Sequence, residues 1–93
     1  MAPESIKKQE YSTKSDVWAF GCLVIEIYNR GDVYPGITLL SIATQVCSGD
    51  LTPNIPKHVP QSLHDMLRRC WSMHPVQRPS MQEIVDIVDK AYH

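Results

Sequence analysis

Apolar side chains are densest in residues 15–30, SDVWAFGCLVIEIYNR, where no charged or strongly polar residue occurs between Val17 and Ile25. Wound as a helix, this segment is apolar on every side. Its three faces are formed by Val17, Phe20, Val24 and Ile27, by Trp18, Cys22 and Ile25, and by Ala19 and Leu23. A helix that is apolar all round must be buried all round. We therefore expect residues 15–30 to form a central helix that the rest of the chain surrounds.

Two other structures compete with this helix. A membrane span would need ~20 apolar residues, and the run here is shorter and is flanked by Asp16 and Glu26. Two short strands broken at Gly21 stay open as an alternative, because periodicity alone does not separate short apolar runs. The length of the segment and the capping residues Thr13 and Ser15 ahead of it favour the helix.

One further helix is predicted before this segment and one after it. Pro3 and Glu4 suit the first turn of a short helix within residues 1–10. Thr38 can cap a second long helix, which Gly49 ends. The apolar positions of that helix, which we expect to face the core, are Leu39, Leu40, Ala43, Val46 and Cys47.

The apolar spacing in the second half of the chain predicts two amphipathic helices. The apolar spacing of the first is set by Leu63, Met66, Leu67, Cys70 and Trp71. The second begins at a capping box formed by Ser80 and Glu83, and its buried stripe is Ile84, Val85, Ile87, Val88 and Ala91. Three prolines should keep residues 51–60 extended over the surface. The predicted fold class is all-α, with one short helix and four longer ones.

Composition narrows the kind of partner and the environment. Nine basic residues stand against ten acidic ones, giving a net charge of -1, which disfavours nucleic acid or an anionic membrane as a partner. Cys22, Cys47 and Cys70 have no CxxC spacing, and we interpret them as buried free thiols in a reducing compartment. The four histidines lack the spacing of a zinc site. No signal peptide precedes the first element, so a cytoplasmic location is expected.

Three short motifs occur in an order that is typical of one family. Residues 2–4, APE, resemble the APE motif of protein kinases, and residues 15–21, SDVWAFG, resemble the SDVWSFG segment that opens the central helix of the kinase C-terminal lobe. Cys70-Trp71, Pro75 and Arg78-Pro79-Ser80 resemble the CW...P..RPS signature near the end of that lobe. The resemblance covers the whole chain, from the end of the activation segment to the C-terminal helix of the kinase domain.

The resemblance also indicates a group within the family. The Cys70-Trp71 pair is similar to the pair at this position in tyrosine kinases and in the tyrosine-kinase-like serine/threonine group. Met81 stands where tyrosine kinases usually carry Phe, and Ile25 where they often have Trp. These departures favour the tyrosine-kinase-like group. Val33 replaces the first proline of the usual P-Y-P-G, so the loop before the second long helix can differ from the family pattern.

The motifs that phosphoryl transfer requires do not occur in these 93 residues. The transfer needs a Gly-rich loop over the phosphates, a nucleotide-binding lysine, an acidic magnesium ligand and a catalytic aspartate, and the sequence has no GxGxxG, VAIK, HRD or DFG. We therefore expect a kinase segment without catalytic, cofactor-binding or metal-binding residues, inactive alone. The resemblance implies a parent that uses ATP and magnesium to phosphorylate Ser/Thr, with Tyr as the alternative, in signal transduction. The alternatives are a truncated kinase relative that acts only as a protein-binding module, and a stand-alone helical domain.

The resemblance assigns structural roles to several residues. It implies that Glu4 pairs with Arg78, whereas the residues alone suggest two unrelated surface charges. It implies that Asp16 holds the catalytic loop, but an acid in the first turn of its own helix is the simpler reading. Gly21 belongs to the central-helix motif. Trp18 and Trp71 are interpreted as core aromatics.

The resemblance also implies that part of this chain binds other proteins. The helix from Thr38 to Ser48 corresponds to the family's docking helix for substrates and regulators. We expect Tyr34, Ile37 and the exposed side of that helix to form a protein-binding surface. Because the central helix of the family also contacts parts absent here, we further expect part of its apolar surface to be uncovered, with the missing N-terminal part of the kinase domain as a partner.

Overall fold

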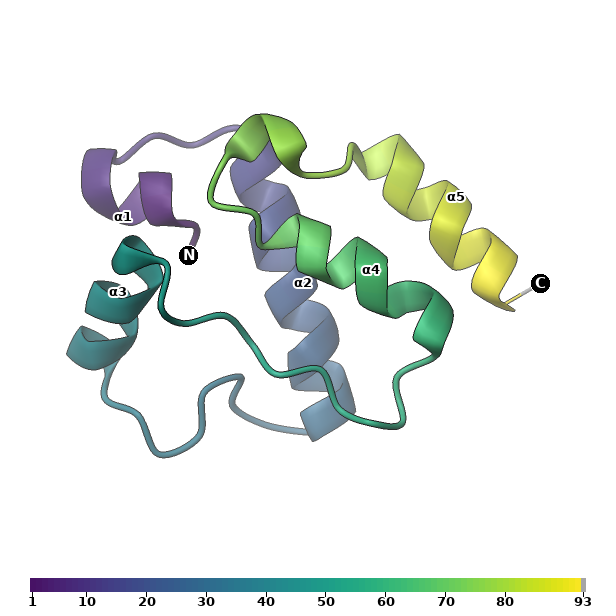
Figure 1. The fold of residues 1–93 in the computed structure, drawn as a ribbon, viewed down its shortest axis with the longest axis horizontal. Helices are drawn as coiled ribbons and strands as arrows, with labels where there is room; N and C mark the ends of the chain where they lie inside the picture. The colour runs from purple at the N-terminus through teal and green to yellow at the C-terminus, as the bar shows by residue number, and fades with distance from the viewer. Residues whose placement is uncertain (93) are drawn as a thin grey trace.

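The computed structural model describes residues 1–92, with side chains described for residues 1–91. Within that range the chain forms five α-helices and one 3-10 turn, η1, without a strand (Figure 1). The elements are α1 (Pro3–Lys8), α2 (Thr13–Asn29), α3 (Leu39–Ser48), α4 (Gln61–Cys70), η1 (Pro75–Gln77) and α5 (Met81–Tyr92). The predicted all-α class is confirmed, and the strand alternative for residues 15–30 is wrong.

The molecule is a thin slab. Its principal extents are 39, 29 and 17 Å. The axes of two packed helices lie about 8–10 Å apart, so the shortest dimension holds no more than two helix layers. α4 packs across α2, α5 packs against α4, and α1 packs against α3 at the other end of the slab (Figure 1). As a result, α2 is covered mainly from one side.

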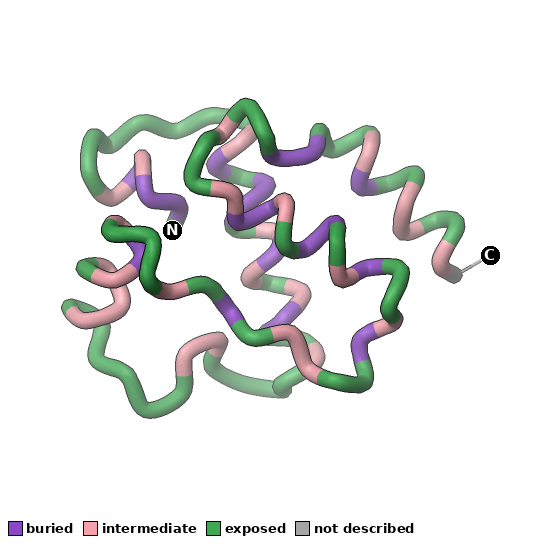
Figure 2. The backbone as a smooth tube through the Cα atoms, viewed as in Figure 1, coloured by how far each residue is buried: buried purple, intermediate pink, exposed green. Residues whose placement is uncertain are grey.

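The core forms where α2 meets α4 and α5. Figure 2 shows buried positions recurring along α2 and α4 between exposed ones. The buried apolar residues of these helices are Val17, Trp18 and Ile25 of α2, Leu63, Met66, Leu67 and Cys70 of α4, and Ile84 of α5. Trp71, directly after α4, joins the same cluster. This cluster holds α2, α4 and α5 together.

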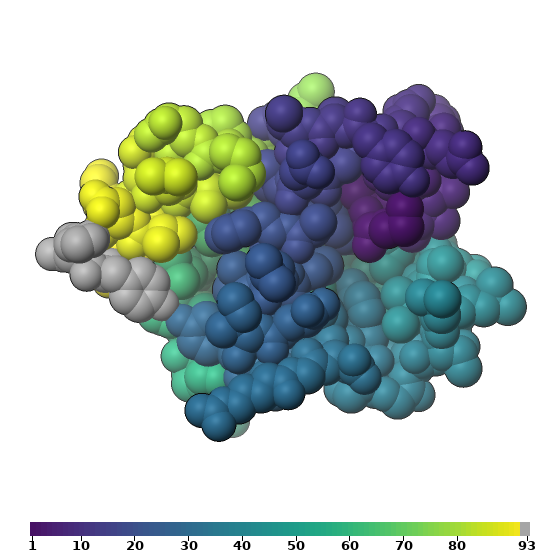
Figure 3. Space-filling view, turned by 180° about the vertical axis from the view of Figure 1, so that it is seen from behind, coloured from purple at the N-terminus to yellow at the C-terminus, as the bar shows by residue number. Residues whose placement is uncertain are grey.

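One face of α2 is open to solvent, so the expectation of burial on every side is wrong. Ala19 is exposed, Leu23 is 51% exposed and Ile27 is 66% exposed. Viewed from behind, α2 lies uncovered along the middle of the molecule, between α5 and α1 (Figure 3). No helix of the slab packs on this side because η1 and α4 both contact the opposite one. These exposed side chains agree with the expectation that part of the apolar surface of this helix is uncovered.

The start of α2 differs slightly from the prediction. Ser12 is the N-cap, and its hydroxyl accepts hydrogen bonds from the backbone N–H groups of Lys14 and Ser15. The Ser15 hydroxyl in turn accepts from the backbone N–H of Ser12, which completes a capping box. Thr13 is therefore the first helical residue and not a cap. The helix ends at Asn29, and Arg30 caps it with a left-handed φ of 54°.

Three smaller expectations need correction. Leu39 and Leu40 do not face the core, since they are 82% and 80% exposed and only Val46 of α3 is buried. The segment 51–60 lies without helix or strand as predicted, but Val59 is buried in the core cluster. Of the three free thiols only that of Cys70 belongs to a buried residue; the other two are partly exposed. Among residues 1–92, no helix is both long and apolar enough to cross a bilayer.

Candidate functional site

Glu4 and Arg78 form a two-pronged ion pair. Arg78 Nη1 and Nη2 donate to Glu4 Oε2 and Oε1 at 2.7 and 2.9 Å. The side chain of Arg78 is fully buried, and that of Glu4 is 14% exposed. A guanidinium matches a carboxylate in this geometry with two parallel hydrogen bonds. The contact implied by the kinase resemblance is present, and it ties α1 to the turn before α5.

Two of the three other N–H groups of the Arg78 guanidinium donate to backbone carbonyls. Its Nε donates to the backbone carbonyl of Ser72 at 2.9 Å, and Nη1 also donates to the carbonyl of Lys14 at 3.0 Å. Lys14 Nζ donates back to the carbonyl of Arg78 at 2.8 Å. The guanidinium lies 5.0 Å from the ring centre of Trp18, within the range of a cation–π contact. A buried charge is stable only when satisfied in this way.

The ion pair changes the acidity of Glu4. Hydrogen bonds from the Arg78 guanidinium lower the pKa of the Glu4 carboxyl to about 2, although partial burial opposes the shift. Ser15 contributes by donating its hydroxyl to Glu4 Oε2 at 3.0 Å. Sequence analysis missed Lys14 and Ser15 as members of this network. Their position in the first turn of α2, next to the buried Trp18, was the available signal.

Gly21 gives Trp71 room to pack. A Cβ at this position would lie 2.7 Å from Trp71 Nε1 and 3.1 Å from Cys70 Cβ. The indole therefore lies directly against the backbone of α2, which only a glycine permits here. Trp18 and Trp71 are both buried. Trp71 Nε1 has no hydrogen-bond partner among the described atoms.

Asp16 lies away from this cluster. It is exposed in the first turn of α2, where its charge favours the positive end of the helix. The 92 described residues hold no group of three His, Cys, Asp or Glu side chains placed for a metal ion. Sequence reasoning also missed an ion pair between α4 and α5, in which Arg69 Nη1 and Nη2 donate to Glu83 at 2.5 and 3.2 Å.

Tyr34 and Ile37, the two predicted docking residues, lie beside the start of α3. Tyr34 is only partly exposed, which corrects the expectation of an exposed aromatic, and its hydroxyl oxygen is buried without a partner in the described chain. Burial raises the pKa of that hydroxyl. Ile37 is 37% exposed. The two residues line hollows rather than forming a flat surface patch.

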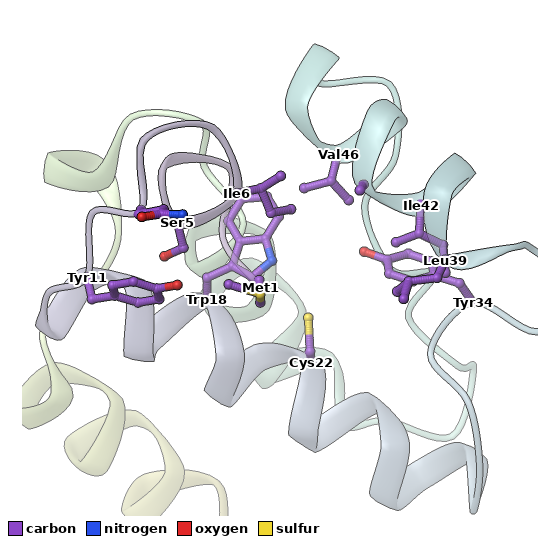
Figure 4. Close-up of a pocket in the computed structure, with 12 residues that line it drawn as sticks. Met1, Ser5, Ile6, Tyr11, Trp18, Cys22, Tyr34, Leu39, Ile42 and Val46 are labelled. Atoms are coloured by element: carbon purple, nitrogen blue, oxygen red, sulfur yellow. The ribbon is translucent and has the colours of Figure 1, made fainter.

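The first hollow, which we call the inner cavity, has a volume of about 420 Å³ and lies between α1, α2 and α3. In Figure 4 the Cys22 thiol and the Tyr34 hydroxyl both point toward its interior, and Trp18, Ile6 and Val46 form apolar walls. Burial raises the pKa of the Cys22 thiol. A second hollow of about 370 Å³, the outer hollow, adjoins it and is lined by Ile37, Leu39, Glu26 and Asp32 among others. Both have the volume of small binding sites, and the inner cavity also has a mainly apolar lining.

Comparison with known proteins matches this arrangement to one family. The model of the protein tyrosine and serine/threonine kinase family matches residues 1–88. The chain belongs to the protein tyrosine and serine/threonine kinase family. Its five helices are the helical part of a kinase C-terminal lobe, and the Glu4–Arg78 pair joins the APE motif to the RPS motif of that lobe.

Three similar relatives are a growth-factor receptor and two proteins named as tyrosine kinases. The chain is 38% identical over 89 residues to platelet-derived growth factor receptor alpha of Takifugu rubripes, covering 95% of this chain and 8% of the relative. It is 40% identical over 84 residues to human protein-tyrosine kinase 6, covering 89% and 18%. It is 37% identical over 94 residues to the Drosophila melanogaster tyrosine kinase receptor Cad96Ca, covering 100% and 12%. This kinase chain therefore spans less than a fifth of the length of each.

These relatives favour tyrosine kinases over the tyrosine-kinase-like serine/threonine group. The sequence preference for the latter rested on Met81 and Ile25. Met81 is exposed and Ile25 is fully buried in the core. Ile25 fills its core position without the larger ring that many tyrosine kinases carry there, so neither residue requires a different fold.

Proposed function

We propose that this chain is the C-terminal scaffold of a protein-tyrosine kinase domain, which positions the rest of that domain and offers a docking surface for a protein substrate or regulator. The observation that carries the proposal is the bare apolar face of α2, formed by Ala19, Leu23 and Ile27. Contiguous exposed apolar surface marks an interaction site. In the proposal its occupant is the N-terminal part of a kinase domain. The names of the relatives support tyrosine as the residue that the complete kinase phosphorylates.

The residues present do not fit ATP and magnesium. The four glycines, Gly21, Gly31, Gly36 and Gly49, are isolated from one another, so no Gly-rich loop can cover phosphates. Asp16 is exposed, and among residues 1–92 it belongs to no group of three His, Cys, Asp or Glu side chains placed for a metal ion. We therefore propose that the 93-residue chain contributes no step of phosphoryl transfer by itself, and that ATP and magnesium bind to other parts of the complete kinase.

Calorimetric titration of ATP with magnesium into the folded 93-residue chain tests whether these residues bind the nucleotide. The proposal expects no saturable heat at concentrations up to the millimolar range that kinases encounter. Circular dichroism on the same sample establishes that the helices are formed. Saturable binding at micromolar concentrations would overturn the scaffold assignment, since it would require a nucleotide site in these residues.

Docking is proposed for the surface around α3. Ile37, Leu39 and Leu40 expose apolar side chains there, next to the two hollows. Apolar anchors that enter a pocket dominate the energy of protein interfaces. Ile37→Asp is expected to weaken a docked protein, whereas Asp86→Lys on the distant α5 is not. Equal binding by both variants would remove the docking part of the proposal and leave the scaffold part intact.

A further inference from the structure

Positive charge is concentrated in residues 51–82. The charged residues of this stretch are four basic ones and one acidic one, namely Lys57, Arg68, Arg69, Arg78 and Asp65. Since the whole chain has a net charge of -1, the residues outside the stretch are net negative. A local excess of one sign of charge attracts ligands of the opposite sign. Residues 51–82 are thus the part of the molecule that favours an anionic ligand.

Within residues 1–91, Arg68 has no internal partner for its charge. By contrast, Arg69 is paired with Glu83, and Arg78 with Glu4. Arg68 is exposed on α4 and lines a hollow of about 350 Å³, which we call the α4 hollow. Its guanidinium is therefore free to meet a ligand in that hollow.

The α4 hollow lies between α4 and the extended segment that precedes this helix. Its less exposed lining is apolar and consists of Pro53, Ile55 and Trp71. Its polar lining consists of Thr52, Asn54, His64 and Arg68. The ring of His64 is held by a hydrogen bond of 3.0 Å between its Nε2 and the backbone carbonyl of Val59. The hollow therefore offers an apolar surface next to several polar groups.

The polar lining suits a phosphate group. Arginine binds phosphate through its planar guanidinium, which can donate two parallel hydrogen bonds. The side chains of Thr52 and Asn54 have no hydrogen-bond partner among the described residues, so both can donate to further oxygens of the same group. Asp65 is exposed on α4 and is not part of the lining. The described lining thus presents donors and one positive charge without a carboxylate.

The apolar lining suits an aromatic ring beside that phosphate. The volume of about 350 Å³ lies within the range of small-molecule sites, so the hollow can hold the group that carries the phosphate as well. Ile55 is half-buried and Trp71 is buried, and an aromatic ring gains by leaving water for apolar surface of this kind. An aryl phosphate combines the two features.

We infer that the α4 hollow binds an aryl phosphate, the side chain of a phosphotyrosine in a partner protein. The phosphate lies against Arg68, with Thr52 and Asn54 as further donors. The ring packs on Ile55 and Trp71. The inference goes beyond the proposed function, because the lining of this hollow shares no residue with the open face of α2 or with the docking surface around α3.

Three fluorescent peptides of equal length test the inference. Each has a Gly/Ser background and carries one central phosphotyrosine, phosphoserine or tyrosine. Binding to the 93-residue chain is measured by fluorescence anisotropy at low salt. The phosphotyrosine peptide is expected to bind about 5-fold more tightly than the tyrosine peptide, since an exposed ion pair contributes a few-fold. The phosphoserine peptide, which lacks the ring, should bind with intermediate affinity.

Two variants with the same change of charge separate the hollow from the charge of the whole stretch. Arg68→Gln should lower the affinity for the phosphotyrosine peptide about 5-fold. Lys57→Gln removes an equal charge at an exposed residue outside the lining and should leave that affinity nearly unchanged. Ile55→Ser should bring the affinities for the phosphotyrosine and phosphoserine peptides closer together. Circular dichroism checks that each variant remains helical.

Nuclear magnetic resonance of the backbone amides locates the bound phosphotyrosine peptide. Shifts are expected in residues 52–55 and 64–71 and not in α1 or α3. These shifts, with weaker binding in Arg68→Gln alone, support the inference. Equal losses in Arg68→Gln and Lys57→Gln would show a diffuse attraction of anions and overturn it. Equal binding of the phosphotyrosine and phosphoserine peptides, or no binding of any peptide, would also overturn it, and either result would leave the scaffold and docking proposals intact.

Discussion

Arg78 donates two hydrogen bonds to the carboxylate of Glu4, although the two residues lie 74 positions apart in the sequence. This pair joins the beginning of the chain to the turn that precedes its last helix. Because Arg78 also binds the carbonyls of Ser72 and Lys14, one buried side chain holds α1, the start of α2 and the segment after α4.

Removing the charge of Glu4 should therefore destabilise the whole fold. Glu4→Gln leaves Arg78 buried without a counter-charge, and losing one partner of a buried pair costs roughly 3 to 5 kcal/mol. Urea unfolding followed by circular dichroism measures the loss. Glu83→Gln is the matched control, because it breaks the partly exposed pair with Arg69 and should cost much less. Equal losses in the two variants would show that the Glu4–Arg78 pair has no special role.

Acid should weaken the fold through the same pair. The pKa of Glu4 is about 2 when folded and 4.5 for the unperturbed group, so the unfolded chain binds a proton more readily. The stabilisation is present above pH 4.5 and is lost as pH falls toward 2. It amounts to roughly 3 kcal/mol. Unfolding free energies of the native chain and Glu4→Gln, compared between pH 6 and 2, should converge; parallel curves would contradict the lowered pKa.

Much of this arrangement could be predicted from the sequence, because helix signals are local. The apolar spacing of residues 63–71 and the capping serine at Ser80 depend on neighbours within one turn, and both match the structure. The exposure of Leu39 and Leu40 could not be predicted in the same way. Their spacing fits a core stripe, and only the tertiary placement of α3 beside α1 determines which of its positions are buried.

The candidate site also combines features that the sequence could predict with features that depend on tertiary structure. Glu4 and Arg78 are far apart in sequence, so residue types alone gave no reason to pair them, and the motif resemblance supplied it. Lys14 and Ser15 were missed because a hydroxyl and an amine near a helix start usually serve local capping or solvent. The hollows were missed because they form between elements whose relative positions the sequence pattern does not encode.

Gly21 is expected to tolerate no side chain. Gly21→Ala places a Cβ 2.7 Å from Trp71 Nε1, and overpacking of this kind costs about 1–3 kcal/mol, which outweighs the helix propensity gained by alanine. Thermal unfolding measures the change. Gly31→Ala, with nothing within 4 Å of its Cβ position, should leave the melting temperature nearly unchanged. If the two variants melt alike, the close packing of Trp71 on α2 is not a constraint.

The bare face of α2 predicts how the isolated chain behaves. Leu23 and Ile27 expose apolar surface, which should bind a hydrophobic dye and promote self-association. Leu23→Ser combined with Ile27→Ser should reduce both effects with only a small loss of stability, since both side chains are at least half exposed. Ile25→Ser is the control on the buried side of the same helix; it should unfold the chain, because removing a buried aliphatic side chain costs about 2–5 kcal/mol.

Dye fluorescence of the folded 93-residue chain tests the central claim most directly, namely that these helices are built around a helix whose other side belongs to the rest of a kinase domain. The account predicts strong fluorescence that falls in the Leu23→Ser, Ile27→Ser variant. A monomer that unfolds cooperatively and binds no dye would contradict it.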